Sequence, residues 1–228
     1  MKHLVLFFKF LFIPVFFFSQ SEESCKSLVY AFNNPEKIIS LDLSNQNLDE
    51  LPKSIGNLVN LKVLVLESNQ LKSLPNSICK LTQLEELGLD GNQLSDLPPC
   101  LSQLTKLIYL GLDENKFTKI PTSIFDLKNL EELYLNENQI TILPESIGNL
   151  EKLNTLELAE NKIVSIPQSI GKLSNLESLV LDGNKFKTIP ETIQKLSKLE
   201  NLFLSEVEMS TTEKTKLKKL LPKCDVEF

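Results

Sequence analysis

Arginine and tryptophan are absent from this 228-residue chain, and all 24 basic residues are lysines. The only histidine is His3, close to the N-terminus. Serine and cysteine nucleophiles usually need an imidazole base, and recognition of phosphate or carboxylate groups usually relies on the arginine fork. The composition therefore predicts a protein that is not an enzyme and that needs no cofactor.

Positive charge is also in short supply, because the formal net charge is −6. Nucleic-acid binding depends on lysine and arginine side chains that neutralise phosphates. An acidic chain without arginine is a poor match to that requirement. We therefore expect no nucleic-acid partner.

Long apolar runs are missing as well, and the N-terminal one is short. Lysines precede an apolar stretch from Phe10 to Phe18, which falls well below the ~20 residues of a membrane-spanning helix. This pattern is typical of a signal peptide, here residues 1–20. We expect export and a mature chain without a transmembrane segment, secreted or at the cell surface, with the periplasm as an alternative. Lipidation at Cys25 stays open but disfavoured, because no apolar residue precedes it as a lipid-attachment motif requires.

A 23-residue period fills most of the remaining sequence. Within Leu61 to Leu81, the alternation at Leu64 and Leu66 indicates a short strand with one buried face. Pro75, Ile78 and Leu81 then step by three, which suits a helical or 3-10 turn that begins at the proline. The proline returns seven times without a change of spacing, at Pro52, Pro75, Pro98, Pro121, Pro144, Pro167 and Pro190. A fixed period of this length predicts a solenoid.

Asparagine recurs three residues after the last strand leucine of each full repeat. It occupies Asn69, Asn92, Asn115, Asn138, Asn161 and Asn184, whereas the first repeat has Gln46. An amide carries two donors and two acceptor sites, so a stacked column can satisfy the backbone of its own turn and of the next one. We attribute the departure at Gln46 to capping.

These motifs resemble the leucine-rich-repeat family, in the 23-residue form with a Leu-Pro-x-x-Ile-x-x-Leu convex half. The opening run from Ala31 to Ser44 is similar to the start of bacterial secreted members. The resemblance implies an α/β, right-handed solenoid with about eight parallel strands on its concave face and helical or 3-10 turns on its convex side.

Both ends of the repeat array show capping features. Leu28 to Phe32 is half a repeat and predicts a short helix over the first strand. Ser210 and Glu213 have capping-box spacing, and an apolar face follows them, which predicts a C-terminal cap helix. The expected organisation is an N-terminal cap at 21–37, leucine-rich repeats at 38–206 and the C-terminal cap helix at 207–228.

The four cysteines do not form a zinc motif, because they include no Cys-x-x-Cys pair. Cys25 and Cys224 belong to opposite ends and cannot pair with each other within one chain. Cys79 and Cys100 lie on neighbouring convex turns but two positions out of register, so a bridge is borderline and unpaired thiols are the expected state. Asp90-Gly91-Asn92 lacks the spacing of a calcium loop, and no metal site is expected.

Side chains that lie between the strand leucines face outward from the concave sheet. Three such columns hold no lysine but eight carboxylates, at Asp42, Glu67, Glu86, Asp90, Asp113, Glu132, Glu157 and Asp182. Two tyrosines stand beside glycines in the middle repeats, where exposed rings are typical of interface anchors. The predicted partner-binding residues are Glu86, Tyr109, Asp113, Glu132, Tyr134, Asn136 and Glu157. Solubility is an equally weighted explanation for the carboxylates.

The resulting functional hypothesis is a non-catalytic module that binds a protein partner, with a host or cell-surface protein as the candidate. The acidic face favours a partner with a basic or mixed-charge surface. The alternative is an intracellular scaffold or regulator resembling leucine-rich-repeat proteins that bind GTPases, which requires the leader to be retained. The sequence leaves partner identity and oligomeric state open.

Overall fold

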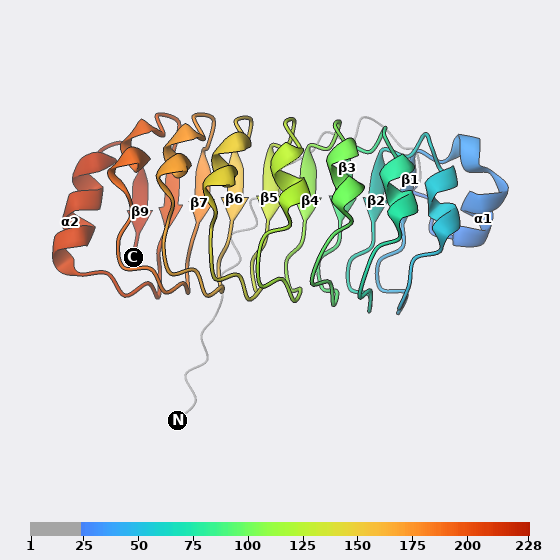
Figure 1. Cartoon of the computed structure of the whole chain (residues 1–228), viewed down its shortest axis with the longest axis horizontal. Helices are drawn as coiled ribbons and strands as arrows, with labels where there is room; N and C mark the ends of the chain where they lie inside the picture. Colours follow the sequence, from blue (N-terminus) through green and yellow to red (C-terminus); the bar gives the residue numbers. More distant parts are fainter. Residues whose placement is uncertain (1–23) are drawn as a thin grey trace, which may run out of the picture.

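The computed structural model describes residues 24–228, so the predicted signal peptide at residues 1–20 lies outside the described part. One parallel sheet of nine strands runs along the molecule in sequence order (Figure 1). Its strands are β1 Ser40–Asp42, β2 Val63–Val65, β3 Glu86–Gly88, β4 Tyr109–Gly111, β5 Glu132–Tyr134, β6 Thr155–Glu157, β7 Ser178–Val180, β8 Asn201–Phe203 and β9 Asp225–Glu227. The predicted solenoid is confirmed, with one strand more than the eight expected.

Short 3-10 turns form a second layer, which Figure 1 shows in front of the strands. They are η1 Pro35–Lys37, η2 Lys53–Asn57, η3 Asn76–Lys80, η4 Pro99–Gln103, η5 Thr122–Asp126, η6 Glu145–Asn149, η7 Gln168–Lys172 and η8 Glu191–Lys195. The proline column stands at the start of η2 to η8. In η3, for example, the Ile78 N–H donates to the Pro75 carbonyl at 3.0 Å, and the Leu81 N–H donates to the Ile78 carbonyl at 3.0 Å.

The core lies between the sheet and the turns. Strand leucines such as Leu64, Leu87 and Leu110 pair in register, and each is fully buried. In each of η2 to η8 an isoleucine, or Leu101 in η4, reaches the same space from the opposite side, as Ile78 does without any exposed surface. Each repeat therefore buries its apolar face against its two neighbours, which is why the array is stable only when stacked.

The asparagine column forms the predicted hydrogen-bonded ladder, but its direction is the reverse of the expected one. Asn92 Nδ2 donates to the Leu89 carbonyl of its own repeat at 2.9 Å and to the Leu66 carbonyl of the preceding repeat at 3.0 Å. Its Oδ1 accepts the Leu71 N–H, also from the preceding repeat, at 3.0 Å. All six asparagines are buried, with exposed fractions of 5–7%.

The residue that begins each bend has a left-handed backbone, and glycine fills that position only twice. The φ angles lie between 51° and 64° at Asn45, Ser68, Gly91, Glu114, Glu137, Glu160, Gly183 and Glu206. Residues other than glycine are disfavoured in this conformation, by roughly 1–2 kcal/mol. Gly91 and Gly183 therefore relieve strain at this bend.

Cys79 and Cys100 form a disulfide with a Cα separation of 5.8 Å, so the expectation of unpaired thiols is wrong. The two-position offset is built into the stacking of the turns. A Cβ atom added at Gly148 would lie 2.8 Å from the Cβ of Ser169, a pair with the same sequence separation as the two cysteines. Facing residues on successive turns are thus 21 positions apart.

Caps close both ends of the core. Helix α1 (Leu28–Asn33) covers the N-terminal end, and Ser27 caps it by accepting the Tyr30 N–H. Helix α2 (Thr211–Leu220) covers the other end, where the Ser210 hydroxyl accepts the Glu213 N–H as the capping box predicts. The C-terminal cap is more than a helix, because β9 extends the sheet and its Asp225 N–H donates to the Glu200 carbonyl at 2.7 Å.

Candidate partner-binding face

The sheet presents its polar side chains on the face away from the leucine core. We call this the sheet face; it comprises the two residues that flank the central leucine of each of β1 to β8 and the residue two positions after each of these strands. Register aligns Tyr109 with Glu86 and Glu132, and Tyr134 with Gly111 and Glu157. The predicted site residues therefore lie on adjacent strands, β3 to β6.

Tyr109 and Tyr134 contact each other at the centre of this face. Their ring centroids are 5.3 Å apart, with the ring planes tilted by 39°. Both side chains are half-buried, where full exposure was expected. The Tyr134 hydroxyl donates to Glu132 Oε2 at 2.7 Å, and Glu132 is only 7% exposed. Glu132 therefore positions the tyrosine pair and offers a partner little surface of its own.

A second ladder crosses the C-terminal ends of the central strands. Asp90 Oδ1 accepts the Asp113 N–H at 2.7 Å, and Asp113 Oδ1 accepts the Asn136 N–H at 2.6 Å. Asn136 Oδ1 in turn accepts the Ala159 N–H at 2.7 Å. Each side chain uses one oxygen to cap the backbone of the next repeat, so these carboxylates are held in fixed positions. The 23-residue spacing of these side chains in the sequence did not reveal that they accept backbone N–H groups of the next repeat.

Two glycines leave room for carboxylates to lie against the sheet. A Cβ atom at Gly88 would stand 2.9 Å from Glu67 Oε1, and one at Gly111 would stand 2.9 Å from Asp90 Oδ1. The acidic side chains thus lean over the strand that follows them. Glu67 and Asp90 belong to this central group, although the sequence prediction did not include them among the partner-binding residues.

Asn136 connects the carboxylates on either side of it. Its Nδ2 donates to Glu157 Oε2 at 2.6 Å and to Asp113 Oδ2 at 3.2 Å. Glu86 lies on β3, directly beside Tyr109 in register, and forms no ion pair within residues 24–228. All seven predicted residues therefore lie in one continuous area of the sheet face.

Burial, and to a smaller extent the crowding of like charges, raises the pKa values of carboxylates on this face. Burial raises the pKa of Asp113 to about 7, and the charge of Asp90 adds to the rise. Burial likewise raises the pKa of Asp90 to about 6, with a further contribution from Glu67. The pKa values of Glu86 and Glu157 are raised as well, again mainly by burial. A positive charge brought to this area would relieve the repulsion.

Cations of the protein itself do little to neutralise the sheet face. Three ion pairs form within residues 24–228, and only Lys26 with Asp42, at 3.8 Å, involves the sheet face, at its N-terminal edge. The same described residues contain no group of histidine, cysteine, aspartate and glutamate side chains that could hold a metal ion. Within residues 24–228, no ion pair therefore neutralises the carboxylates at the centre of the sheet face.

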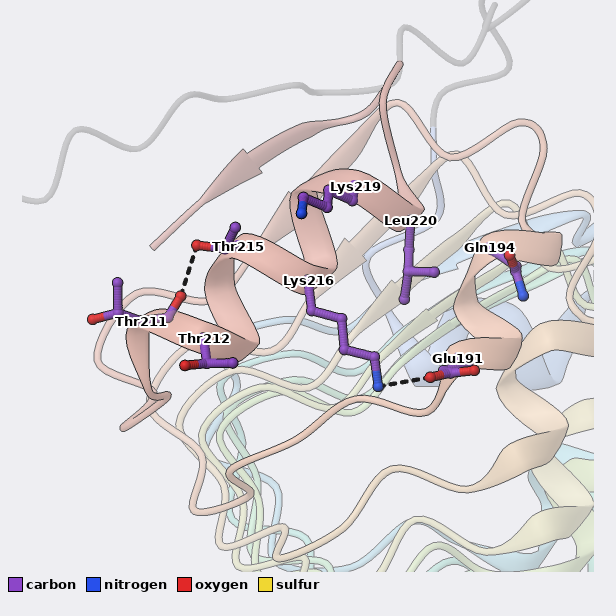
Figure 2. A pocket seen from close by; sticks show the side chains of 8 residues that line it. All are labelled: Glu191, Gln194, Thr211, Thr212, Thr215, Lys216, Lys219 and Leu220. Atoms are coloured by element: carbon purple, nitrogen blue, oxygen red, sulfur yellow. Dashed lines mark hydrogen bonds and ion pairs between the residues drawn. The ribbon is translucent and has the colours of Figure 1, made fainter.

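A hollow of about 640 Å³ lies elsewhere, between η8 and the cap helix α2 (Figure 2). Its wall includes Thr211, Thr212 and Thr215, and Lys216 Nζ reaches Glu191 Oε1 across it at 2.9 Å. The ion pair ties the cap helix to the last turn. None of the predicted partner-binding residues lines this hollow.

Comparison with known proteins identifies the class. The model of the leucine-rich repeat region matches residues 4–107, 55–139 and 133–222. The chain belongs to the leucine-rich-repeat family, whose members are generally non-catalytic modules that bind protein partners. No curated protein matches the chain. Within the described residues, no helix has the length and apolar character needed to cross a membrane.

Solved structures with the same fold come from bacteria and plants. An internalin, inlF, from Listeria monocytogenes has a TM-score of 0.78 and 27% identity, covering 89% of this chain and 57% of its own. Internalin C2 from the same organism has a TM-score of 0.75 and 26% identity, covering 86% and 82%. The ectodomain of the Arabidopsis thaliana membrane receptor kinase GASSHO1/SCHENGEN3, in complex with CASPARIAN STRIP INTEGRITY FACTOR 2, has a TM-score of 0.70 and 38% identity, covering 76% and 22%. The chain therefore spans less than two thirds of two of these three proteins.

Proposed function

We propose that this protein is an exported, non-catalytic leucine-rich-repeat module that binds a protein partner through the sheet face, and that the partner presents a basic or mixed-charge surface. The observation that carries the proposal is the central area of fixed carboxylates without a lysine. Charged groups arranged in this way steer a partner of opposite charge and fix its orientation.

The size of the face is adequate for a specific complex. Eight spacings of ~4.8 Å between nine strands give a sheet about 38 Å long. A standard interface occupies ~800 Å² on each partner, which a surface of this length can supply. The plant receptor ectodomain was solved in a complex, and a similar use of the repeat surface is proposed for this chain.

Export is proposed from two independent features. The first is the leader-like segment at residues 1–20. The second is the Cys79–Cys100 disulfide, because such bonds persist in oxidising compartments and are rare in the cytosol. The disulfide counts against the alternative of an intracellular regulator that binds GTPases. A bacterial host-interaction or cell-surface role is the version of this proposal that we favour.

Charge neutralisation on the two sides of the molecule tests the proposal. The sheet-face variant combines Glu86→Gln, Asp113→Asn and Glu157→Gln. The matched control combines Glu50→Gln, Asp126→Asn and Glu151→Gln, which are exposed side chains outside the sheet face. Both variants replace three carboxyl groups, and above about pH 8, where Asp113 is ionised as well, they change the net charge by nearly the same amount, so a difference between them reports position.

Extracellular proteins captured by cross-linking to the immobilised wild-type protein provide the readout. We expect the control variant to retain the captured partner and the sheet-face variant to lose it. The remaining association should also depend less on salt in the sheet-face variant, since fewer charges attract the partner. Equal capture by both variants would place the interface elsewhere and reject the proposal.

A further inference from the structure

The centre of the sheet face combines two aromatic rings with three carboxylates. We call Glu67, Asp90, Asp113, Tyr109 and Tyr134 the tyrosine–carboxylate patch. Glu67 leans over Gly88 and Asp90 leans over Gly111, and Gly111 pairs in register with Tyr134. Burial, and then the charges of Asp90, Glu67 and Asp113, raise the pKa of Tyr109. This group of residues therefore lies close enough together to act on one ligand.

We propose that the patch is the seat for an arginine side chain presented by an extended segment of the partner protein. This inference rests on the proposed function and names the chemistry that the sheet face recognises. The guanidinium group stacks on the tyrosine rings, and its N–H groups donate to carboxylate oxygens of Glu67, Asp90 and Asp113, which keep acceptor lone pairs beyond those used by bonds within the protein.

Arginine fits both halves of the patch better than lysine does. A guanidinium group is planar, stacks on aromatic faces and presents a fork of donors that matches a carboxylate. The tilted pair of rings, with centroids 5.3 Å apart, offers such faces. Lysine carries a strongly hydrated point charge that can satisfy the carboxylates but gains less from the rings.

The carboxylates of Asp90 and Asp113 are preorganised in the free protein. Oδ1 of Asp90 and Oδ1 of Asp113 each accept a backbone N–H, and Asp113 Oδ2 also accepts a bond from Asn136 Nδ2 at 3.2 Å, which fixes both side chains. A ligand therefore loses little free energy to ordering them. Gly88 and Gly111 carry no side chain that would cover the carboxylates leaning over them.

Side-chain recognition is the only route open in the middle of the sheet. Strands β4 and β5 are each hydrogen-bonded to a strand on both sides, so their backbones cannot pair with an added strand. A partner segment that crosses them must be bound by what its side chains reach. This condition favours one long protruding side chain over a flat surface.

The occupant cannot be a second copy of this protein, because the chain contains no arginine. A self-association through lysines would bring together two copies that are both acidic overall. Charge complementarity therefore assigns the patch to a different protein, and the segment that fills it supplies the guanidinium group missing from the chain.

Peptide titration followed by NMR tests the proposal on the intact protein. The probe is a nine-residue glycine–serine peptide with two arginines, and matched peptides carry two lysines or two citrullines, which keep the shape of arginine without its charge. The chain has three tyrosines, so the ring signals of Tyr109 and Tyr134 can be followed against Tyr30, which lies on α1 and is 54% exposed.

We expect the arginine peptide to shift the two patch tyrosines and to bind about 10-fold more tightly than the citrulline peptide, with lysine in between. A Tyr109→Val, Tyr134→Val variant should lose most of this preference. Valine already occupies the same columns in β2, so the fold can accept it. Phe203→Val on β8 is the matched control and should bind as the wild type does.

A second variant protects the test against a failure to fold. Asp90→Asn with Asp113→Asn keeps an oxygen for each backbone N–H and should weaken binding of the arginine peptide without lowering the thermal melting temperature. Equal binding of arginine and citrulline, tighter binding of lysine, or unchanged binding in these variants would overturn the inference. If the arginine inference fails but the sheet-face variant still loses the captured partner, the proposed function stands. If the sheet-face variant also captures the partner normally, the inference and the proposed function both fail.

Discussion

Replacing Asn115 by alanine should destabilise the protein far more than replacing the corresponding Gln46 at the N-terminal end. Asn115 is 7% exposed, and its Nδ2 donates to the Leu89 carbonyl at 3.0 Å. Its Oδ1 accepts the Leu94 N–H at 2.9 Å. Alanine leaves this buried N–H without an acceptor, and an unpaired buried group costs about 1–3 kcal/mol.

Gln46 is the matched control because it occupies the same column but is exposed. Its side chain donates once, to the Lys26 carbonyl at 3.1 Å. Surface changes of this kind usually stay within about 0.5 kcal/mol. Equilibrium urea unfolding of the two alanine variants, followed by far-ultraviolet circular dichroism, gives both values. Equal losses of unfolding free energy would refute the assignment of the asparagine column as a buried ladder.

Three further perturbations have defined outcomes. Cys100→Ser opens the Cys79 link and should lower the unfolding free energy by about 3 kcal/mol by loop-entropy arithmetic, after which a reductant should have no further effect on thermal melting. Glu137→Gly should raise the unfolding free energy by about 1 kcal/mol by relieving a positive φ of 52°, and Gly91→Ala should lower it, both read from urea midpoints. The pKa of Asp113 is higher in the folded chain, about 7 against 3.8, so folding takes up a proton in that window and stability should rise as the pH falls from about 7 to about 4. Asp113→Asn should flatten this dependence of the melting temperature, and an unchanged slope would contradict it.

Most of the fold was predictable because each repeat contains the same short motif, which specifies one strand and one turn. The alternation at Leu64 and Leu66 and the proline at Pro75 determine strand and turn within a single repeat, and periodicity extends them to the others. Strand β9 was not predictable by this route. Its only apolar residue is Val226, and it forms because a long-range pairing with β8 is available after the cap helix turns the chain back.

The sequence allowed us to predict which side chains of the candidate site face outward, but not the hydrogen bonds that they make or how far they are buried. Alternation alone places Tyr109, Tyr134 and Glu157 on the outward face, as register confirms. The buried position of Glu132 goes with a hydrogen bond that it accepts from the Tyr134 hydroxyl, two residues further along the same strand, and column positions do not encode this bond. The Cys79–Cys100 bond escaped for a similar reason, since counting by the period ignores the offset between facing turns.

The direction of the asparagine ladder determines the order in which the hydrogen bonds of the repeats can be completed during synthesis. Because each amide bonds the repeat before it, a repeat emerging from the ribosome holds unsatisfied backbone groups until the next asparagine has been synthesised. Loss of residues from the C-terminal end would therefore leave backbone groups of the last remaining repeat unpaired, whereas loss from the N-terminal end would leave the asparagine side chain of the first remaining repeat without its partners in the lost repeat. The C-terminal cap matters accordingly, since the column offers no amide after Asn184 and Val207 takes that position.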